Sequence, residues 1–205
     1  ATSDTDIMNM ALAYLGASLI IDRKDPSQEA LICDLNYDEV RDSVLEDVNW
    51  SFAIKRFVLS SPLVDKPAYR FANAFEVPPE VLRIICLDDD RPPMGGVYPM
   101  SGRFFDNSME HTNIPWVLEE GKILTDAMKI NFRAIIRVTD PNKFTKSFVG
   151  CLAARLASEI ALPITNSPDM QARMVDMYMG KKRWAQANDG RQGLNQVRFS
   201  PGFVR

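Results

Sequence analysis

Residues 49–56, Asn-Trp-Ser-Phe-Ala-Ile-Lys-Arg, mark the point where the pattern of the sequence changes. Before this segment the apolar residues are spaced as in amphipathic helices. After it they occur in short runs rich in β-branched and aromatic residues, which are interrupted by prolines. Trp50 and Phe52 therefore stand between a helical part and a sheet part, and we expect both rings to form a core hinge between the two lobes.

A second interpretation of the same segment is a nucleic-acid patch, because Lys55 and Arg56 follow the aromatic residues. The charge distribution argues against this role. The chain carries a formal charge of −3, and residues 181–205 contain six cations and one acid, so the remaining residues carry −8. An acidic body opposes phosphate binding. We therefore prefer the core interpretation.

Two helices are expected before the junction. The first is predicted from about Asp6 to Leu15, with Asp4 or Asp6 as its N-cap and Gly16 as its stop. The second is predicted from the N-cap Ser27 to about residue 47. Its expected apolar stripe comprises Ala30, Leu31, Leu35, Val40, Val44 and Leu45.

The middle of the chain predicts an antiparallel sheet of about five to seven strands, judged by turn spacing. The expected strands are residues 54–60, 69–77, 82–87, 116–118, 123–125 and 130–138. Glu119-Glu120-Gly121-Lys122 predicts a hairpin turn, because glycine supplies the positive φ that a tight turn needs. Residues 88–115 are rich in proline and glycine and predict a long surface loop.

Two more helices are expected near the C-terminus. The first is predicted at residues 144–162, ending at Pro163, and the second from Ser167-Pro168-Asp169 to about residue 188. Short helix–helix connections favour antiparallel neighbours. The predicted fold is therefore α+β, a helical bundle built from the N- and C-terminal helix pairs with an inserted antiparallel β-sheet domain.

The expected boundaries follow from this layout. Residues 1–53 form the N-terminal part of the bundle, 54–140 the inserted β domain with its loop 88–115, and 141–189 the C-terminal part of the bundle. Residues 190–205 form an extended C-terminal arm, which carries more apolar groups than it can bury alone, so we expect it to order on a partner. Its candidate contact residues are Arg191, Arg198, Phe199, Phe203 and Arg205.

The sequence contains few features that indicate catalysis. The sequence contains no phosphate-binding loop, dinucleotide-binding fingerprint or nucleophile elbow. His111 is the only histidine and lies far in sequence from Cys33, Cys86 and Cys151, so we expect buried reduced thiols and no metal site. No apolar run approaches the roughly 20 residues that cross a bilayer, and we expect neither a membrane association nor a cofactor.

Two acidic groups remain as weak candidates for chemistry. Asp88, Asp89 and Asp90, followed by Arg91, could bind a cation, although an acidic loop is the preferred interpretation. This loop, together with His111, is a possible partner-contact surface. Glu119 with Asp126 could form the carboxylate pair of a glycoside hydrolase, but many other acid pairs would fit equally well.

Several blocks, taken in order, carry a resemblance to a known family. They are residues 11–16 (Ala-Leu-Ala-Tyr-Leu-Gly), 30–53, 69–79, 121–126 (Gly-Lys-Ile-Leu-Thr-Asp), 136–148 and 152–165. This series, spanning about residues 7–187, resembles the tail tubular protein A or tail adaptor family of short-tailed bacteriophages. The sequence departs from the family pattern at Asn49, where a proline would be expected, and at Asn131-Phe132, where a tyrosine would be expected.

The resemblance implies a structural protein of the virion tail, assembled in the host cytoplasm, and not an enzyme. It implies a homo-oligomeric head-tail connector ring of twelve subunits between the portal protein and the tail nozzle (tail tubular protein B), with tail fibres or spikes attached outside. Genomic DNA would pass through the lumen without specific binding during ejection, and the arm 190–205 would bind the portal. A related tail accessory or head-completion protein with cell-wall-degrading activity is the second hypothesis, and a DNA-binding module is the third.

Overall fold

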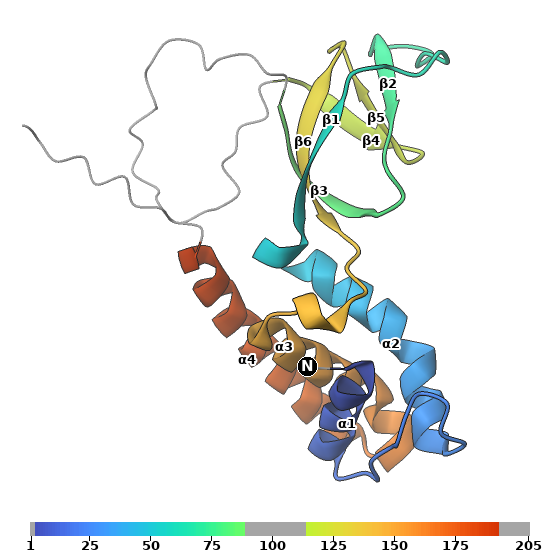
Figure 1. The fold of residues 1–205 in the computed structure, drawn as a ribbon, viewed down its shortest axis with the longest axis vertical. Coiled ribbons are helices and arrows are strands. Elements are labelled where there is room, and N and C mark those ends of the chain that lie inside the picture. Colours follow the sequence, from blue (N-terminus) through green and yellow to red (C-terminus); the bar gives the residue numbers. More distant parts are fainter. Residues whose placement is uncertain (1–2, 89–113, 193–205) are drawn as a thin grey trace, which may run out of the picture.

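The chain forms a helical lobe and a β lobe stacked end to end, as the computed structural model shows (Figure 1). The structure describes residues 3–88 and 114–192. Helices α1 and α2 precede the strands and helices α3 and α4 follow them, so the chain enters the β lobe once and returns once. The predicted α+β class, with an antiparallel sheet region inserted between two helix pairs that pack together, is confirmed.

Helix α1 (Asp4–Leu15) begins with a reciprocal cap that the sequence prediction missed. Ser3 is the N-cap, in place of Asp4 or Asp6: its Oγ accepts from the Asp6 N–H at 3.1 Å, and the Asp6 carboxylate accepts from the Ser3 N–H at 2.8 Å. This capping box satisfies two N–H groups that have no partner inside the helix. The helix ends at Gly16, whose φ of +68° favours glycine.

Helix α2 (Gln28–Asp47) begins after the N-cap Ser27 and ends at the predicted residue. Its buried face is formed by Ala30, Cys33, Tyr37, Val40, Arg41, Val44 and Leu45. The prediction was wrong for Leu31 and Leu35, which are 70% and 80% exposed. At 3.6 residues per turn these two side chains lie on the side of the helix opposite Cys33, so they point away from the core.

Helix α3 (Lys146–Thr165) starts and ends two to three residues later than predicted. Thr145 is its N-cap, which excludes Phe144 from the helix. Pro163 lies inside the last turn and does not end the helix. The N–H of Asn166, a residue with a φ of +51°, donates to the Leu162 carbonyl at 2.9 Å and closes the last turn.

Helix α4 (Pro168–Gln192) extends past the predicted end near residue 188. Residues 190–192 are therefore helical, and the predicted arm of residues 190–205 began too early. The Ser167 hydroxyl accepts from the Met170 N–H at 3.3 Å, as expected for a cap followed by proline at the first helical position.

Helix α3 is the centre of the helical lobe and packs against α1, α2 and α4. Leu152, Leu156 and Ile160 are fully buried, and the alanines between them let the neighbouring helices approach closely. By length and composition this helix could span a membrane, but most of its apolar stretch is buried inside the protein. Burial against the other helices therefore accounts for its apolar character.

The β lobe contains two antiparallel sheets of three strands each. The first has the order β1 (Ile54–Leu59), β6 (Ile130–Ile136), β3 (Val81–Asp88), and the second the order β2 (Asn73–Glu76), β5 (Lys122–Thr125), β4 (Trp116–Glu119). Strand β2 is shorter than the predicted residues 69–77, because Arg70 has a φ of +72° and cannot belong to an extended strand. Strand β6 likewise ends two residues early.

The two sheets share a second apolar core. Phe75 and Ile123 from one sheet are buried with Ile130 and Phe132 from the other. The predicted hairpin between β4 and β5 is confirmed, with Glu120 and Gly121 both at positive φ (51° and 72°). This pair of positive φ values defines a turn whose twist matches that of the strands.

Candidate assembly surface

The junction between the lobes is an aromatic cluster. Trp50 is fully buried, and its indole ring meets Phe148 of α3 edge to face, with 5.1 Å between ring centroids. Phe52 and Phe144 pack on the same Phe148 ring at 5.1 Å and 4.7 Å. The 3-10 turn Ser51–Ala53 joins α2 to β1, and the turn Pro141–Lys143 joins the return segment to α3. The cluster therefore ties both crossings of the chain to the central helix.

Two arginines of the β lobe bind the C-terminal half of α2. Arg83 on β3 donates to the Glu46 carbonyl at 2.8 Å and to Asn49 Oδ1 at 2.6 Å. Arg137, just after β6, donates from Nε to Asp42 at 2.6 Å. The β lobe thus contacts the C-terminal part of α2 from two segments, β3 and the residue that follows β6.

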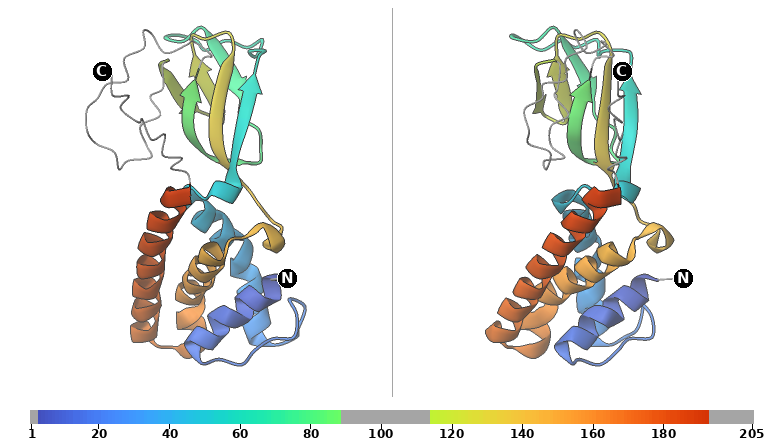
Figure 2. Two further views of the ribbon diagram at one scale, coloured as in Figure 1. Left: turned by 60° about the vertical axis from the view of Figure 1, so that its left-hand side comes forward. Right: turned by 90° about the vertical axis from the view of Figure 1, so that its left-hand side faces the viewer.

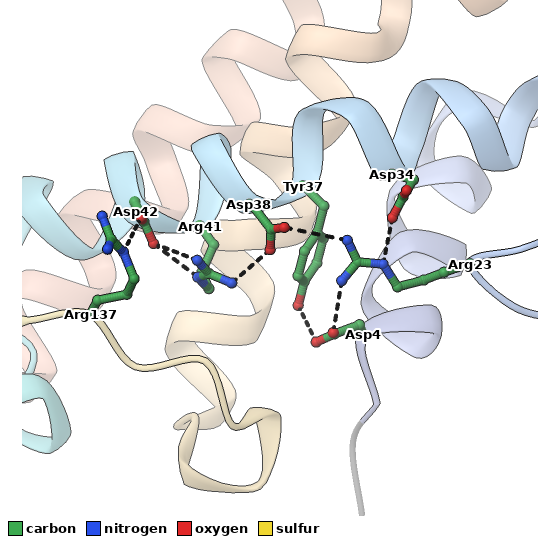
Figure 3. Close-up of polar contacts among 8 residues, drawn as sticks. All are labelled: Asp4, Arg23, Asp34, Tyr37, Asp38, Arg41, Asp42 and Arg137. Atoms are coloured by element: carbon green, nitrogen blue, oxygen red, sulfur yellow. Dashed lines mark hydrogen bonds and ion pairs between the residues drawn. The ribbon is translucent and has the colours of Figure 1, made fainter. Parts of the chain in front are cut away.

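The Arg137–Asp42 pair is one end of a polar row along α2 (Figure 3). Next in the row, Arg41 pairs with Asp42 at 2.8 Å and with Asp38 at 2.7 Å. Arg23, from the loop before α2, then pairs with Asp34 at 2.5 Å.

The far end of the row reaches the first turn of α1. Arg23 pairs with Asp4 at 3.1 Å, and Tyr37 donates its hydroxyl to the same carboxylate at 2.8 Å. Burial, followed by the bond and charge of Asp4, raises the pKa of Tyr37 well above its usual value. The row therefore connects α1, the loop before α2, α2 itself and the strand returning from the β lobe.

The row fixes the relative positions of these elements, but it contributes little to the free energy of unfolding. Arg41 is only 6% exposed, and a guanidinium at that depth needs its two carboxylates. The other pairs are partly or largely solvated, and solvated ion pairs contribute at most about 1 kcal/mol each. The consequence for function is a fixed arrangement of acidic groups along one side of the helical lobe.

Helices α2 and α4 are linked at the end that faces the β lobe. Asp47 accepts a short hydrogen bond from the Tyr178 hydroxyl and pairs with Lys182 at 2.9 Å. Burial alone would raise the pKa of Asp47, but the bonds from Tyr178 and Lys182 outweigh it and hold this pKa below its usual value. Burial and the Asp47 carboxylate both raise the pKa of Tyr178.

Two outward-facing helix surfaces carry large apolar side chains together with charge. We define the acidic face of α2 by Leu31, Leu35, Asp38, Glu39 and Glu46, all exposed. The exposed side of α4 carries Met179 and Trp184 together with charges of both signs, Arg173, Asp176 and Arg183. An apolar centre with charged surroundings is the usual composition of a protein–protein contact.

The β lobe carries an open groove of about 380 Å³ between the loop before β2 and the outer side of the sheet β2–β5–β4. Tyr69, Arg70 and Phe71 form one wall, and Val117 and Leu124 contribute to the floor. The Arg70 guanidinium lies over the Phe71 ring at 5.5 Å from its centroid. The sequence offered no signal for this groove, because the loop and the sheet that form it are brought together only by folding.

The remaining predicted site residues lie at the margins of the described chain. Asp88 is the last residue of β3, paired in register with Asn131. Arg191 lies in the last turn of α4, so it belongs to a helix and not to the predicted extended arm. Residues outside the described part are Asp89, Asp90, Arg91, His111, Arg198, Phe199, Phe203 and Arg205.

The structure separates the two carboxylates that could have formed a hydrolase pair. Glu119 is opposite Lys122 at the turn end of the β4–β5 hairpin, whereas Asp126 follows the other end of β5. The four residue steps from Lys122 to Asp126 span about 13 Å of extended backbone, whereas the paired carboxylates of glycoside hydrolases lie on the order of 5–10 Å apart. The Asp126 carboxylate instead accepts from the Ala72 N–H at 2.9 Å.

The three cysteines are all buried, and none of them forms a disulfide. Burial raises the pKa of Cys33 and of Cys151 to about 11. A thiol with such a pKa is a poor nucleophile near neutral pH. Among the described residues, no group of three or more His, Cys, Asp or Glu side chains is placed to hold a metal ion.

No family model matches the sequence, and no curated protein is significantly similar to it. The relationship to tail adaptors is therefore a hypothesis that depends on the ordered sequence blocks and on how well the site fits it.

Proposed function

We propose that this chain is the subunit of a tail adaptor ring, a structural protein that links the portal to the tail nozzle of a short-tailed bacteriophage and forms part of its DNA channel. The observation that carries the proposal is the position of the sequence blocks in the structure. They include the end of α1, α2 with the Trp50 junction, the β4–β5 hairpin, the return segment and α3. Three of these blocks, the Trp50 junction, the return segment and the start of α3, meet in the aromatic cluster between the lobes.

The charge of the helical lobe supports a channel that releases DNA. Helix α2 contains seven acidic residues and one base, Arg41; four of the acids pair with arginine or lysine side chains, and Glu39 and Glu46 are exposed. An acidic wall repels the phosphate backbone and would allow a genome to pass without being held. The acidic face of α2 therefore favours an adaptor over a DNA-binding module.

The chemistry of the described side chains supports a structural role over a cell-wall hydrolase. The Cys33 and Cys151 thiols are buried with a raised pKa, and Glu119 and Asp126 lie at opposite ends of the β4–β5 hairpin. The groups that the structure does present outward are apolar and charged helix faces, which suit assembly. We infer that the partners are other copies of the chain, the portal, the nozzle and the tail fibres or spikes.

Sedimentation with purified portal rings tests this proposal. The full chain should move with the portal in a gradient, and a variant that ends at Gln192, where α4 ends, should stay folded but bind the portal more weakly because it lacks the proposed portal-binding segment. A full chain that stays at the top of the gradient at every ratio would refute the adaptor role. Cleavage of peptidoglycan by the purified chain would instead support the hydrolase hypothesis.

A further inference from the structure

The two sheets of the β lobe pack against each other, and each leaves two outer strands (Figure 2). An outer strand presents unpaired backbone groups, and proteins block such an edge with charged side chains, bulges or a covering segment. Strand β1 carries the exposed cations Lys55 and Arg56, and the pairing of β3 with β6 shifts register twice. Strand β2 is covered, because the Leu63 N–H donates to the Ala74 carbonyl at 2.8 Å.

Strand β4 is the edge that lacks this protection within the described chain. It pairs only with β5, in an unbroken register from Trp116 to Glu119. Its first three residues are apolar, and its single charged residue, Glu119, stands at the turn. An apolar, regular and uncovered edge is the kind that accepts a further strand.

The hairpin turn decides which backbone groups of β4 point outward. Glu120 and Gly121 form a turn of two residues, and the pair that flanks such a turn is hydrogen-bonded. Hydrogen-bonded and non-hydrogen-bonded pairs alternate along antiparallel strands, so Trp116 and Leu118 direct their N–H and carbonyl groups away from β5. These groups are the ones that would bond the main chain of an added strand.

The open groove of the β lobe adjoins this edge. Val117 and Glu119 of β4 line the groove together with Leu124 of β5, because alternate residues of a strand share one face. In an added strand, the residue opposite Val117 would present its side chain on the same face. A large apolar side chain at that position would lie over Val117 and Leu124, with Tyr69 and Phe71 as the far wall of the groove.

The far wall of the groove is held in a strained backbone conformation. The Phe71 N–H donates to the Tyr69 carbonyl at 2.9 Å across Arg70, whose φ is +72°, which defines a γ-turn of the rare kind. Such strain in a residue other than glycine is concentrated at binding and switch sites. The turn keeps Tyr69 83% exposed beside the groove, where its ring can pack on an incoming side chain.

The charge at the β4 edge is negative. Glu119 ends the strand and Glu120 follows it in the turn, and both are exposed. The cations that line the groove stand farther from the edge: Lys122 lies on β5, and Lys66 and Arg70 lie in the loop before β2. Opposite charges directly across from each other stabilise neighbouring strands, so an added strand with a lysine or arginine opposite Glu119 is favoured.

We propose that β4 is a docking edge for an extended segment of a partner protein. The segment adds antiparallel to β4, as every strand pair of the lobe is antiparallel. It places a large apolar side chain opposite Val117 and a basic side chain opposite Glu119. The backbone of β4 supplies the affinity, and the groove supplies the specificity. The inference goes beyond the adaptor role and does not depend on it.

NMR titration of the 15N-labelled full chain with a synthetic peptide tests the docking edge. The probe is acetyl-Ser-Thr-Lys-Thr-Phe-Thr-Lys-Thr-Ser-amide, which has a phenylalanine and a lysine two positions apart. One altered peptide has serine in place of phenylalanine, and a second has glutamate in place of both lysines. A third carries N-methyl groups on the two threonines next to phenylalanine, which removes the N–H groups that strand addition needs but leaves the side chains unchanged.

The probe should shift the amide signals of Trp116 and Leu118 saturably and slow their hydrogen exchange. Loss of the phenylalanine ring should weaken binding roughly tenfold, the charge reversal should weaken it severalfold, and N-methylation should abolish it. Undiminished binding of the N-methylated peptide would show occupation of the groove alone and overturn the proposal. No binding of the probe, or slow exchange of both amides in the free chain, would overturn it as well.

A pair of protein variants tests the same bond from the other side. Leu118→Pro removes an N–H that points away from β5, a position where an edge strand tolerates proline, and Leu118→Thr keeps it. The proline variant should bind the probe at least tenfold more weakly, and the threonine variant within twofold of the native chain. Melting curves check both folds, and the N-methylated peptide still decides if the proline variant unfolds. Equal binding by two folded variants would overturn the proposal.

The oligomeric state of the chain separates a foreign partner from a second copy. A dimer that forms without peptide and is lost in Leu118→Pro would assign the edge to a second copy and overturn the proposal. Peptide binding by a chain that never moves with the portal would leave the docking edge intact and refute the adaptor role. Portal binding without peptide binding would keep the adaptor role and refute the docking edge.

Discussion

The Trp50 indole N–H donates to the Val44 carbonyl at 2.8 Å. This bond closes the end of α2 over the junction, while the indole ring fills the space against Phe148. The carbonyls in the last turn of a helix have no partner inside the helix, so a buried side chain that satisfies one of them fixes where the helix ends. Trp50 thus combines packing and hydrogen bonding at the point where the two lobes meet.

Truncation of Trp50 should be the most destabilising single change at the junction. Trp50→Ala should lower the free energy of unfolding by about 3–5 kcal/mol, because it leaves a cavity beside Phe148. Trp50→Phe should cost less, since a ring remains but the hydrogen bond to Val44 is lost. Urea unfolding measures both. Trp184→Ala is the matched control, because Trp184 is largely exposed, and it should change stability by less than about 0.5 kcal/mol. Equal losses at both tryptophans would contradict the assignment of Trp50 to the core.

The angle between the lobes should depend on Arg83 and Arg137. Spin labels on Leu35→Cys in the bundle and Val58→Cys in the β lobe report the distance between the lobes, and the native thiols are buried. Arg83→Ala with Arg137→Ala should broaden the distance distribution, because both contacts to α2 are lost. Lys55→Ala is the control, since Lys55 pairs with Glu80 inside the β lobe. An unchanged distribution in the double variant would show that the aromatic cluster alone sets the angle.

Asp47 should make stability fall in acid. Its pKa is lower in the folded protein than the usual 3.8, so the ionised form stabilises the fold above about pH 4, and this contribution is lost as the pH falls through the lowered pKa. Asp47→Asn should be less stable than the native chain at pH 6, by on the order of 1 kcal/mol or less because the group is partly solvated. The two proteins should converge as the pH falls through the lowered pKa of Asp47. Urea melts from pH 6 into the acid range measure the difference, and a difference that does not shrink as the pH is lowered would contradict the assignment.

The cysteines should be unreactive until the protein unfolds. With a pKa of about 11 for Cys33 and Cys151, roughly one thiol in a thousand is ionised at pH 8, and all three cysteines are buried. A disulfide reagent should therefore label none of them quickly in native protein and all three in denaturant. Leu35→Cys serves as the exposed control and should react at once. Rapid labelling of the native chain would show that one of the helices or strands opens readily.

Most helix and strand positions could be predicted because each is encoded locally. Ser27 as a cap, Gly16 as a stop and Gly121 in the hairpin each follow from one residue type in one setting. The errors arose where more than one residue could fill the same role at the end of a helix. Ser3 displaced Asp4 and Asp6 because Asp6 serves better as the reciprocal half of the cap. Pro163 did not end α3 because the following residues still close a turn.

The candidate assembly surface was predictable only in part. The junction at Trp50 follows from the change of pattern, but Leu31 and Leu35 were assigned to the core because they are apolar. Their angle around the helix, opposite the stripe formed by Ala30, Cys33 and Tyr37, was the signal that they point outward. The ion-pair row from Asp4 to Arg137 joins residues far apart in sequence, so no local pattern could have revealed it.

Mass photometry of the purified chain, alone and after mixing with portal rings, tests the adaptor role most directly. The account predicts that each portal ring gains a single discrete mass close to twelve times the 23.1 kDa of the chain, with no intermediate species at saturation. Portal rings whose mass stays unchanged at every concentration of the chain would contradict it.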